Sequence, residues 1–205
     1  VDYLIDTFMN NDDISLITLG PLTNAAQAIL KEPKLKERIP EILCMGGSAI
    51  AGNYNAVAEF NIYVDPEAAK KVFESGIPIR MVGLNLTRQN SITMEDVEMM
   101  RSIDTKVSRF AAELLSFNAG KSGKCSICDA CTVVWYIDPA IIKKSLMTHV
   151  DVETKGEFTR GMTVCDWRSH MGLDPKTDIE HGEACDIEFE MKPANVDVAM
   201  EFDID

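Results

Sequence analysis

Three cysteines and one aspartate lie close together in the stretch CSICDAC. Cys125, Cys128 and Cys131 follow one another at intervals of three residues, and Asp129 stands between the last two. Thiolates at this spacing could begin a zinc or iron-sulfur site, but such sites normally have four ligands, and the next histidine along the chain is His149. Packing cysteines are the simpler interpretation, and the metal site and the redox pair stay open as alternatives.

Asp129 is the more promising residue of this stretch. It directly precedes ACTVVWYI, an apolar run that predicts a buried helix, so its carboxylate is expected at or near a helix N-terminus. It also argues against a redox pair, because Cys128 is followed by an acid and not by a helix-opening basic residue.

A second polar group lies in the stretch GNYNAVAEFN, residues 52–61. If this stretch is extended, the two-residue period of a strand places Glu59 and Asn61 on one face and Phe60 on the other, with Asn53 upstream. A carboxylate that accepts and amides that both accept and donate suit a ligand with several hydroxyl groups. The alternative is an ordinary polar loop with asparagines in its turns.

These residues need a scaffold, and the sequence predicts alternating strands and helices. Apolar runs at 14–20, 40–47 and 77–84 predict strands. The first ends in LGPLTN, where Gly-Pro is typical of a turn and Thr23 or Asn24 offers a helix N-cap. A second helix is expected from Asp65-Pro66 to Gly76.

The remaining pattern predicts two more helices and an antiparallel unit. One helix begins near Thr93, with Asp96 as capping-box partner. The next is amphipathic, with an apolar side made of Val107, Phe110, Ala111, Leu114 and Leu115. Residues 149–166 alternate around a Lys-Gly-Glu turn and predict a hairpin, and 196–204 predict a final strand.

This order of elements is typical of an α/β fold with a mostly parallel sheet flanked by helices, of the open Rossmann type, with an antiparallel hairpin near the C-terminus. We expect one domain over residues 1–205. In such a sheet ligands bind at the carboxyl ends of the strands, so the loops described above are the first candidates for a site.

Composition narrows the function. With 205 residues, 46% hydrophobic and 26% charged, the chain is typical of a globular protein. A net charge of -13 argues against nucleic acid or an anionic membrane as partner and favours a neutral or cationic small ligand. Six cysteines without a secretory pattern predict reduced thiols and a cytoplasmic protein.

Several of these stretches occur together, in this order, in one family. The chain resembles the inosine-uridine preferring nucleoside hydrolases from about Ile14 to its C-terminus. The resemblance rests on LGPLTNAA (19–26), MGGSAIAGNYNAVAEFNIYVDPEAAKKVF (45–73), GIPIRMVGLNLT (76–87), CDACTVVWYIDP (128–139) and VDVETKGEFTRGMTVCD (150–166).

The resemblance implies hydrolysis of the N-glycosidic bond of ribonucleosides to ribose and a free nucleobase by a calcium-bound water, as in purine and pyrimidine salvage. It implies a small-molecule nucleoside partner and a homo-oligomer. By similarity, Asp129 and the backbone carbonyl of Leu19 are calcium ligands, and Asp129 is also catalytic. Asn53, Glu59 and Asn61 match positions that bind the ribose hydroxyls.

Three departures from the family pattern qualify this expectation. The aspartate-rich signature Asp-Thr-Asp-x-Gly-x-Asp-Asp of the first family strand is absent, so we expect the N-terminal strands to be missing, an open sheet edge or exposed apolar surface, and a chain inactive by itself. Cys128 stands where many members have a histidine, which places it as a catalytic residue on the leaving-group side. Asn85 replaces a common aspartate, with no role apparent from sequence.

Base specificity stays open at this stage. The alternative function is a non-catalytic or degenerate homologue that binds nucleosides without hydrolysing them.

Overall fold

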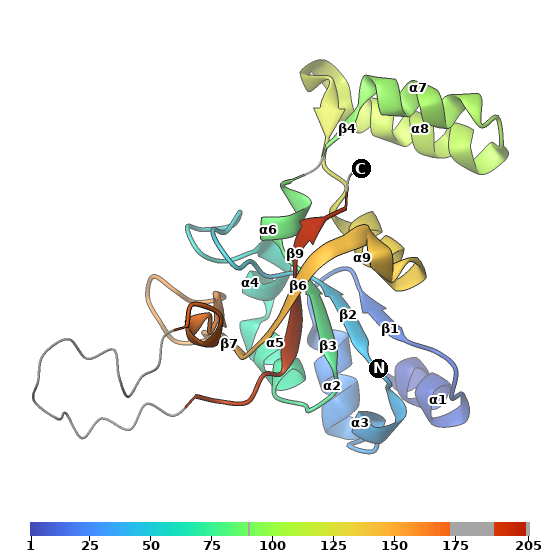
Figure 1. Cartoon of the computed structure of the whole chain (residues 1–205). Coiled ribbons are helices and arrows are strands. Elements are labelled where there is room, and N and C mark those ends of the chain that lie inside the picture. Colours follow the sequence, from blue (N-terminus) through green and yellow to red (C-terminus); the bar gives the residue numbers. More distant parts are fainter. Residues whose placement is uncertain (90, 173–190, 204–205) are drawn as a thin grey trace, which may run out of the picture.

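The computed structural model describes residues 1–89, 91–172 and 191–203, and a five-stranded sheet forms its centre (Figure 1). In spatial order the strands are β1 (Leu16–Thr18), β2 (Ile42–Met45), β3 (Ile79–Val82), β9 (Val196–Phe202) and β6 (Ile142–Thr148). The first four are parallel, and β6 pairs antiparallel with β9. This confirms the predicted α/β fold with a mostly parallel sheet.

The burial of each strand follows from its place in the sheet. β2 lies between β1 and β3, and all four of its residues are buried, which explains the unbroken apolar run ILCM. All three residues of β1 are only partly buried. Within the described residues β1 pairs with β2 alone, so it forms one edge of the sheet.

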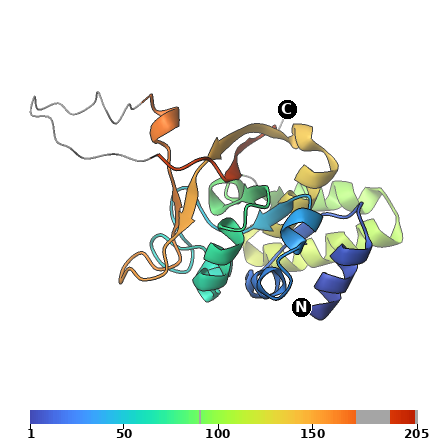
Figure 2. The same ribbon diagram turned by 90° about the horizontal axis from the view of Figure 1, so that it is seen from below.

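Helices cover both faces of the sheet (Figures 1 and 2). Neighbouring strand residues point to opposite faces. Met81 packs in the larger core cluster with residues of α2 (Thr23–Lys31) and α5 (Pro66–Phe73), whereas Val82 packs in a second cluster with residues of α9 (Cys128–Ile137). Helices α2 and α5 therefore lie on one face and α9 on the other. The short helices α1 (Asp2–Asn10) and α3 (Leu35–Arg38) contact each other beside α2.

Local signals set the ends of α5 and α7 (Met94–Ser102) as predicted, but not the start of α2. Thr23 and Asn24 lie inside α2, its N-cap is Leu22 without a side-chain cap, and the Thr23 hydroxyl donates instead to the Asp65 carboxylate at 2.5 Å. Asp65 caps α5 by accepting from the backbone N–H of Ala68, and Gly76 follows the helix with a positive φ of 84°. Thr93 and Asp96 form a reciprocal capping box at α7. The sequence patterns did not predict α1, α3, α4 (Phe60–Val64), α6 (Leu84–Thr87), β4 (Ile92–Thr93), β5 (Lys124–Cys125) or β6.

Helices α7 and α8 (Lys106–Ala119) form an arm that stands away from the sheet and is joined to it through the short pair β4 (Ile92–Thr93) and β5 (Lys124–Cys125) (Figure 1). The helix predicted around Phe110 is confirmed, but its large apolar residues are not in a core. Val107 is 77% exposed and Phe110 63%, while the small Ala112 is buried against α7. The buried residues of α8 are the small Ser108, Ala112 and Ala119, and on α7 Val97 is fully buried. The wider apolar side of α8 faces outward.

The predicted hairpin is confirmed as β7 (Val150–Val152) paired antiparallel with β8 (Thr163–Cys165). It is anchored to the loop before α4 by a bridge between Ala58 and Met162. The predicted strand 196–204 is β9 up to Phe202, and its last residue lies outside the described residues. Three short 3-10 turns complete the described structure: η1 (Gly120–Ser122), η2 (Pro139–Ile141) and η3 (Arg168–His170).

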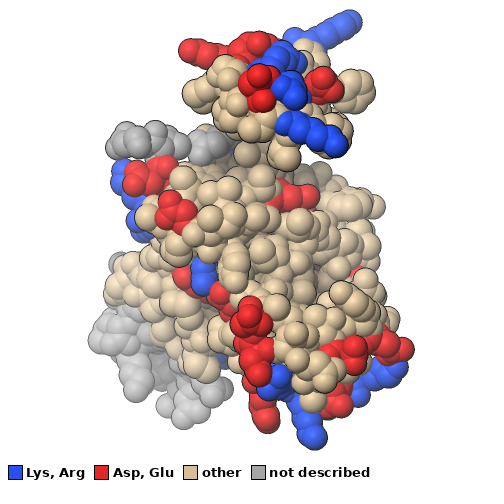
Figure 3. Space-filling view, turned by 90° about the vertical axis from the view of Figure 1, so that its right-hand side faces the viewer, with Lys and Arg blue, Asp and Glu red and all other residues tan. Residues whose placement is uncertain are grey.

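Charge is unevenly spread over the face that carries β1 and α9. Figure 3 shows acidic and basic side chains on the arm above and around the lower end of this face, with a mostly uncharged surface between them. Among the described residues, no helix is long and apolar enough to cross a membrane.

Candidate functional site

Three loops leave the sheet at the carboxyl ends of its strands. Leu19 follows β1, Gly46 and Gly47 follow β2, and Gly83 follows β3. Because these strands are parallel and adjacent, their carboxyl ends meet at the same edge, where α/β sheets bind ligands.

Helix α9 begins at this same edge. Cys131, in its first turns, packs in one cluster with Val82, the last residue of β3, and with Leu86 of α6. One turn further along α9, the ring of Trp135 lies 5.4 Å from the guanidinium carbon of Arg80, near the start of β3. The helix therefore runs antiparallel to β3, and its N-terminus lies at the carboxyl edge of the sheet.

Asp129 stands in the first turn of α9, as the sequence predicted. Its side chain is exposed and makes no hydrogen bond or ion pair with any described residue. The unpaired N–H groups at a helix N-terminus favour a negative charge there. The carboxylate is thus accessible and uncommitted, which is what binding a cation or accepting a proton from water requires.

The three neighbouring thiols have different surroundings. The Cys131 thiol donates to the carbonyl of Ile127 at 2.8 Å, and burial, with the adjacent Cys128 and Asp129, raises its pKa to about 11. The Cys125 thiol lies 3.7 Å from the carbonyl of Leu115 on α8. Cys128 is half-buried at the first position of α9. Cys125 and Cys131 therefore act as packing residues, as the sequence analysis favoured.

The structure corrects the expectation that residues 59–61 are extended. Glu59 is the N-cap of α4, and Asn61 lies in the first turn of that helix. The Glu59 carboxylate is 3% exposed and accepts from the backbone N–H groups of Asn61, Ile62 and Gly47 at 2.9, 3.2 and 3.0 Å. A carboxylate at an N-cap satisfies helix N–H groups that would otherwise lack partners, and this favours the helix over a strand.

The two asparagines are also tied to the backbone, but less completely. Asn61 Nδ2 donates to the carbonyl of Met45 at 3.0 Å, and Asn53 Oδ1 accepts from the N–H of Phe60 at 2.9 Å. The Oδ1 atom of Asn61 and the Nδ2 atom of Asn53 have no partner among the described residues. One acceptor and one double donor therefore stay free near the carboxyl end of β2.

Two residues to which the sequence assigned no role hold this loop from outside. Asn85 Oδ1 accepts from the N–H of Ala49 at 3.2 Å, and its Nδ2 donates to the carbonyl of Ala199 in β9 at 2.8 Å. Thr163 of β8 bonds both backbone groups of Ser48. The signal for Asn85 was a polar residue three positions after the end of a buried strand. For Thr163 it was a polar residue in an inward-facing strand position.

A calcium ion is the group that the family resemblance implies here. Asp129 and the carbonyl of Leu19 are oxygen donors of the type calcium prefers, and both stand at the carboxyl edge. Calcium takes about six to eight oxygen ligands. Across 1–89, 91–172 and 191–203, no group of three His, Cys, Asp or Glu side chains could hold a metal ion. The described residues do not form a complete calcium site.

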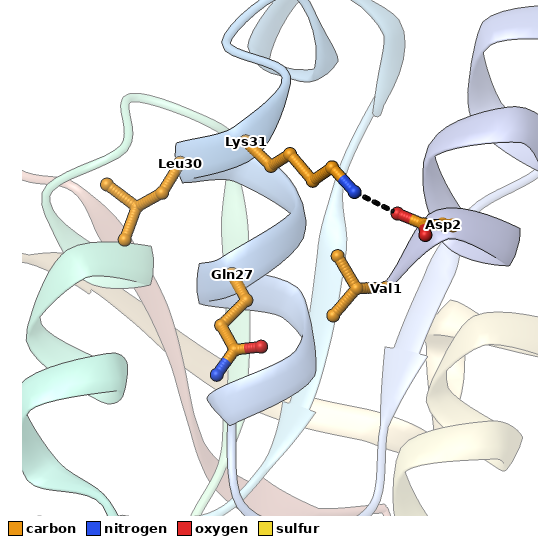
Figure 4. Close-up of a pocket in the computed structure, with 5 residues that line it drawn as sticks. All are labelled: Val1, Asp2, Gln27, Leu30 and Lys31. Carbon is orange, nitrogen blue, oxygen red and sulfur yellow. Dashed lines mark hydrogen bonds and ion pairs between the residues drawn. The ribbon is translucent and has the colours of Figure 1, made fainter.

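A separate surface groove lies towards the amino ends of the strands, away from the loops described above. Figure 4 shows its five lining residues, which come from the start of α1 and the second half of α2: Val1, Asp2, Gln27, Leu30 and Lys31. Lys31 and Asp2 form an ion pair across it at 2.5 Å. Since α2 starts at the carboxyl edge and runs back along the sheet, its second half lies far from the loops described above.

Similarity to known proteins agrees with this geometry. The family model "Inosine-uridine preferring nucleoside hydrolase" matches residues 1–205. The pyrimidine-specific ribonucleoside hydrolase RihA of Enterobacter sp. (strain 638) is 40% identical over 191 residues, which cover 87% of this chain and 59% of the relative. RihA of Photobacterium profundum is 44% identical over 163 residues, or 76% of this chain and 52% of the relative.

A solved structure gives the same answer for the fold. The purine-preferring ribonucleoside hydrolase from Gardnerella vaginalis superposes with a TM-score of 0.76 at 30% identity, covering 99% of this chain and 60% of the other. The chain thus spans between half and two thirds of the length of these relatives. A family match over the whole chain, together with a matching fold, shows that the protein belongs to the inosine-uridine preferring nucleoside hydrolase family.

Proposed function

We propose that the protein hydrolyses the N-glycosidic bond of ribonucleosides to give ribose and a free nucleobase. The observation that carries this proposal is the uncommitted carboxylate of Asp129, which shares the carboxyl edge of the sheet with the Asn53–Asn61 loop. Family membership and the ribonucleoside hydrolase names of the relatives support it.

We assign ribose binding to Asn53, Glu59 and Asn61. The free Nδ2 of Asn53 can donate to a ribose hydroxyl, and the free Oδ1 of Asn61 can accept from one. A carboxylate has about four acceptor positions, and Glu59 uses three for backbone N–H groups, so it can accept one further hydroxyl. Contacts of this kind can favour the oxocarbenium-like transition state of glycoside cleavage by holding the sugar in shape.

We assign Asp129 and Cys128 to the reacting end of the substrate. Asp129 is proposed as a catalytic carboxylate and, with the Leu19 carbonyl, as a calcium ligand, supported by its exposed position at a helix N-terminus. Further oxygen ligands are needed for calcium, so the 205-residue chain by itself is proposed to be inactive. Cys128 is proposed to lie on the side of the departing base.

The names of the relatives direct the choice of substrate. The RihA relatives are named as pyrimidine-specific, and the Gardnerella vaginalis enzyme is named as purine-preferring. The higher identity to the pyrimidine-specific enzymes makes uridine and cytidine the first substrates to test. We further propose a homo-oligomer located in the cytoplasm, a location supported by the free thiols of the described cysteines.

The test is an assay of ribose release from uridine, cytidine and inosine, by this chain and by the product of the full reading frame that contains it. Each is assayed with added calcium and after treatment with a chelator. We expect calcium-dependent release by the full product. If neither polypeptide releases ribose from any ribonucleoside, the proposed hydrolysis is wrong.

A second candidate function is nucleoside binding without hydrolysis. It is favoured by the incomplete set of metal ligands among the described residues, together with an intact polar loop. Equilibrium binding of uridine without ribose release, in both the chain and the full product, would support it over the first candidate.

A further inference from the structure

Thr163 forms a two-way hydrogen-bonded contact with the loop after β2. Its hydroxyl accepts from the backbone N–H of Ser48 at 2.8 Å and donates to the carbonyl of the same residue at 2.7 Å. Thr163 is 2% exposed and Ser48 3% exposed, so water is excluded from these bonds. In the described structure Thr163 is the partner of both buried backbone groups of Ser48, although the two residues are 115 positions apart in sequence.

The preceding residue is shaped to admit this threonine. Gly47 has a positive φ of 75°, and a Cβ atom there would lie 2.8 Å from the Cγ2 methyl group of Thr163. A side chain at residue 47 would therefore clash with Thr163 and also strain the backbone. Gly47 and Thr163 fit each other closely, which fixes the path of the chain as it leaves β2.

This contact lies next to the residue that we assign to ribose. The N–H of Gly47, one residue before Ser48, donates to Glu59 Oε2 at 3.0 Å. The N–H of Ala49, one residue after it, donates to Asn85. Three consecutive backbone N–H groups thus point to three side chains from three different segments. A shift of the Ser48 peptide would move the Gly47 N–H and with it the Glu59 carboxylate.

We propose that Thr163 is a positioning residue for ribose binding: its hydroxyl holds the Ser48 peptide and thereby sets the Glu59 carboxylate in the orientation that receives a ribose hydroxyl. The proposal rests on the function proposed above. The β7–β8 hairpin contributes none of the proposed substrate contacts, and it is thereby assigned an effect on substrate affinity that acts through Glu59.

Two substitutions separate the hydroxyl from the shape of the side chain. Thr163→Val keeps the shape and leaves the N–H and carbonyl of Ser48 buried without partners, whereas Thr163→Ser keeps the hydroxyl. Both are made in the full reading frame product, and KM, kcat and the melting temperature are measured. We expect Thr163→Val to raise KM by about tenfold or more, since leaving the buried N–H and carbonyl of Ser48 without partners is enough to displace the loop. The KM of Thr163→Ser should stay within about threefold of the wild-type value.

The identity of the substrate gives a sharper criterion. Since ribose is common to all ribonucleosides, the KM increase in Thr163→Val should have the same factor for uridine and for inosine, and the affinity for free ribose should fall with it. If Thr163 only stabilised the fold, Thr163→Val would lower the melting temperature without this pattern of KM values. The proposal is overturned if Val and Ser give the same KM, or if the effect depends on the base.

A readout without catalysis keeps this test separate from the proposed hydrolysis. Amide hydrogen exchange should speed up in Thr163→Val at Ser48 and also at Gly47, Asn61 and Ile62, whose N–H groups bind Glu59. Faster exchange at Ser48 alone would overturn the proposal, even if the wild type released no ribose. If Thr163→Val does not fold, Thr163→Cys takes its place, because a thiol is a weaker hydrogen-bonding group and should give an intermediate effect.

Discussion

The two halves of the candidate site are built in opposite ways. In the Asn53–Asn61 loop, the polar side chains are held by backbone groups, and Glu59 alone accepts three hydrogen bonds. At the start of α9, Asp129 is exposed and makes no hydrogen bond or ion pair with a described residue. The fold itself therefore holds the side chains of the first half in place, whereas the second half exposes the carboxylate of Asp129.

This difference teaches which substitutions report on chemistry and which report on structure. Replacing a group that the fold holds in place changes stability and binding together, because buried backbone groups lose their partners. Replacing a free carboxylate on a helix surface leaves the fold nearly unchanged. The two halves should therefore respond to mutation in distinguishable ways, and four predictions test this, from the largest expected effect to the smallest.

Asp129→Ala should cause the largest loss of activity with almost no loss of stability. We expect ribose release by the full reading frame product to fall by at least ~100-fold, as when a catalytic group is removed, while the melting temperature falls no more than the loss of one acid from a helix N-terminus accounts for. The matched control is Glu95→Ala, which removes an exposed acid from the first turn of α7 on the arm. A large drop in the melting temperature of Asp129→Ala alone would contradict the comparison.

Glu59→Gln should impair both properties. The amide keeps the size of the side chain but points an NH₂ group at backbone donors, so we expect a loss of about 1–3 kcal/mol in unfolding free energy together with an increased KM. Urea denaturation and steady-state kinetics measure the two effects. If KM rises while the unfolding free energy is unchanged, Glu59 is not the structural anchor that its hydrogen bonds indicate.

The thiols of α9 should differ in reactivity. The pKa of Cys131 is raised to about 11, chiefly by burial, so at about pH 8 it is almost wholly a thiol and alkylates slowly. The half-buried Cys128 should be labelled first, as followed by mass spectrometry. Because the folded pKa lies above the ordinary value of 9.0, this thiol favours the folded state below pH 9 and loses that contribution as pH rises through about 11. Faster labelling of Cys131 than of Cys128 would contradict the assigned burial.

Cys125→Ser should have the smallest effect. Its thiol makes one long contact with the carbonyl of Leu115, on the arm and away from the Asn53–Asn61 loop. We expect kcat/KM to change by less than about twofold and zinc and iron to be absent from the purified wild type by elemental analysis. Stoichiometric metal that is lost on this substitution would restore the thiolate-site alternative.

Sequence patterns predicted most of the fold but misplaced one part of the site. Period-2 alternation suggested that Glu59 and Asn61 share a strand face, yet Glu59 caps a helix of five residues. A helix this short has too few residues for its own period to show, and the cap is completed by Gly47, 12 positions earlier. The α8 pattern was read correctly as a helix, but its exposed side could not be inferred, because periodicity does not say which apolar face finds a partner.

What the sequence determined by itself are the features that depend on neighbours along the chain: the buried strands, the caps at Asp65 and Thr93, the helix that begins beside Asp129, and the family resemblance carried by contiguous motifs. What only the tertiary structure decided are the roles of Thr163 and Asn85, whose partners lie 115, 36 and 114 positions away. The physical reason is that a buried hydrogen bond is specified by the three-dimensional path of both segments, and no local pattern encodes that path.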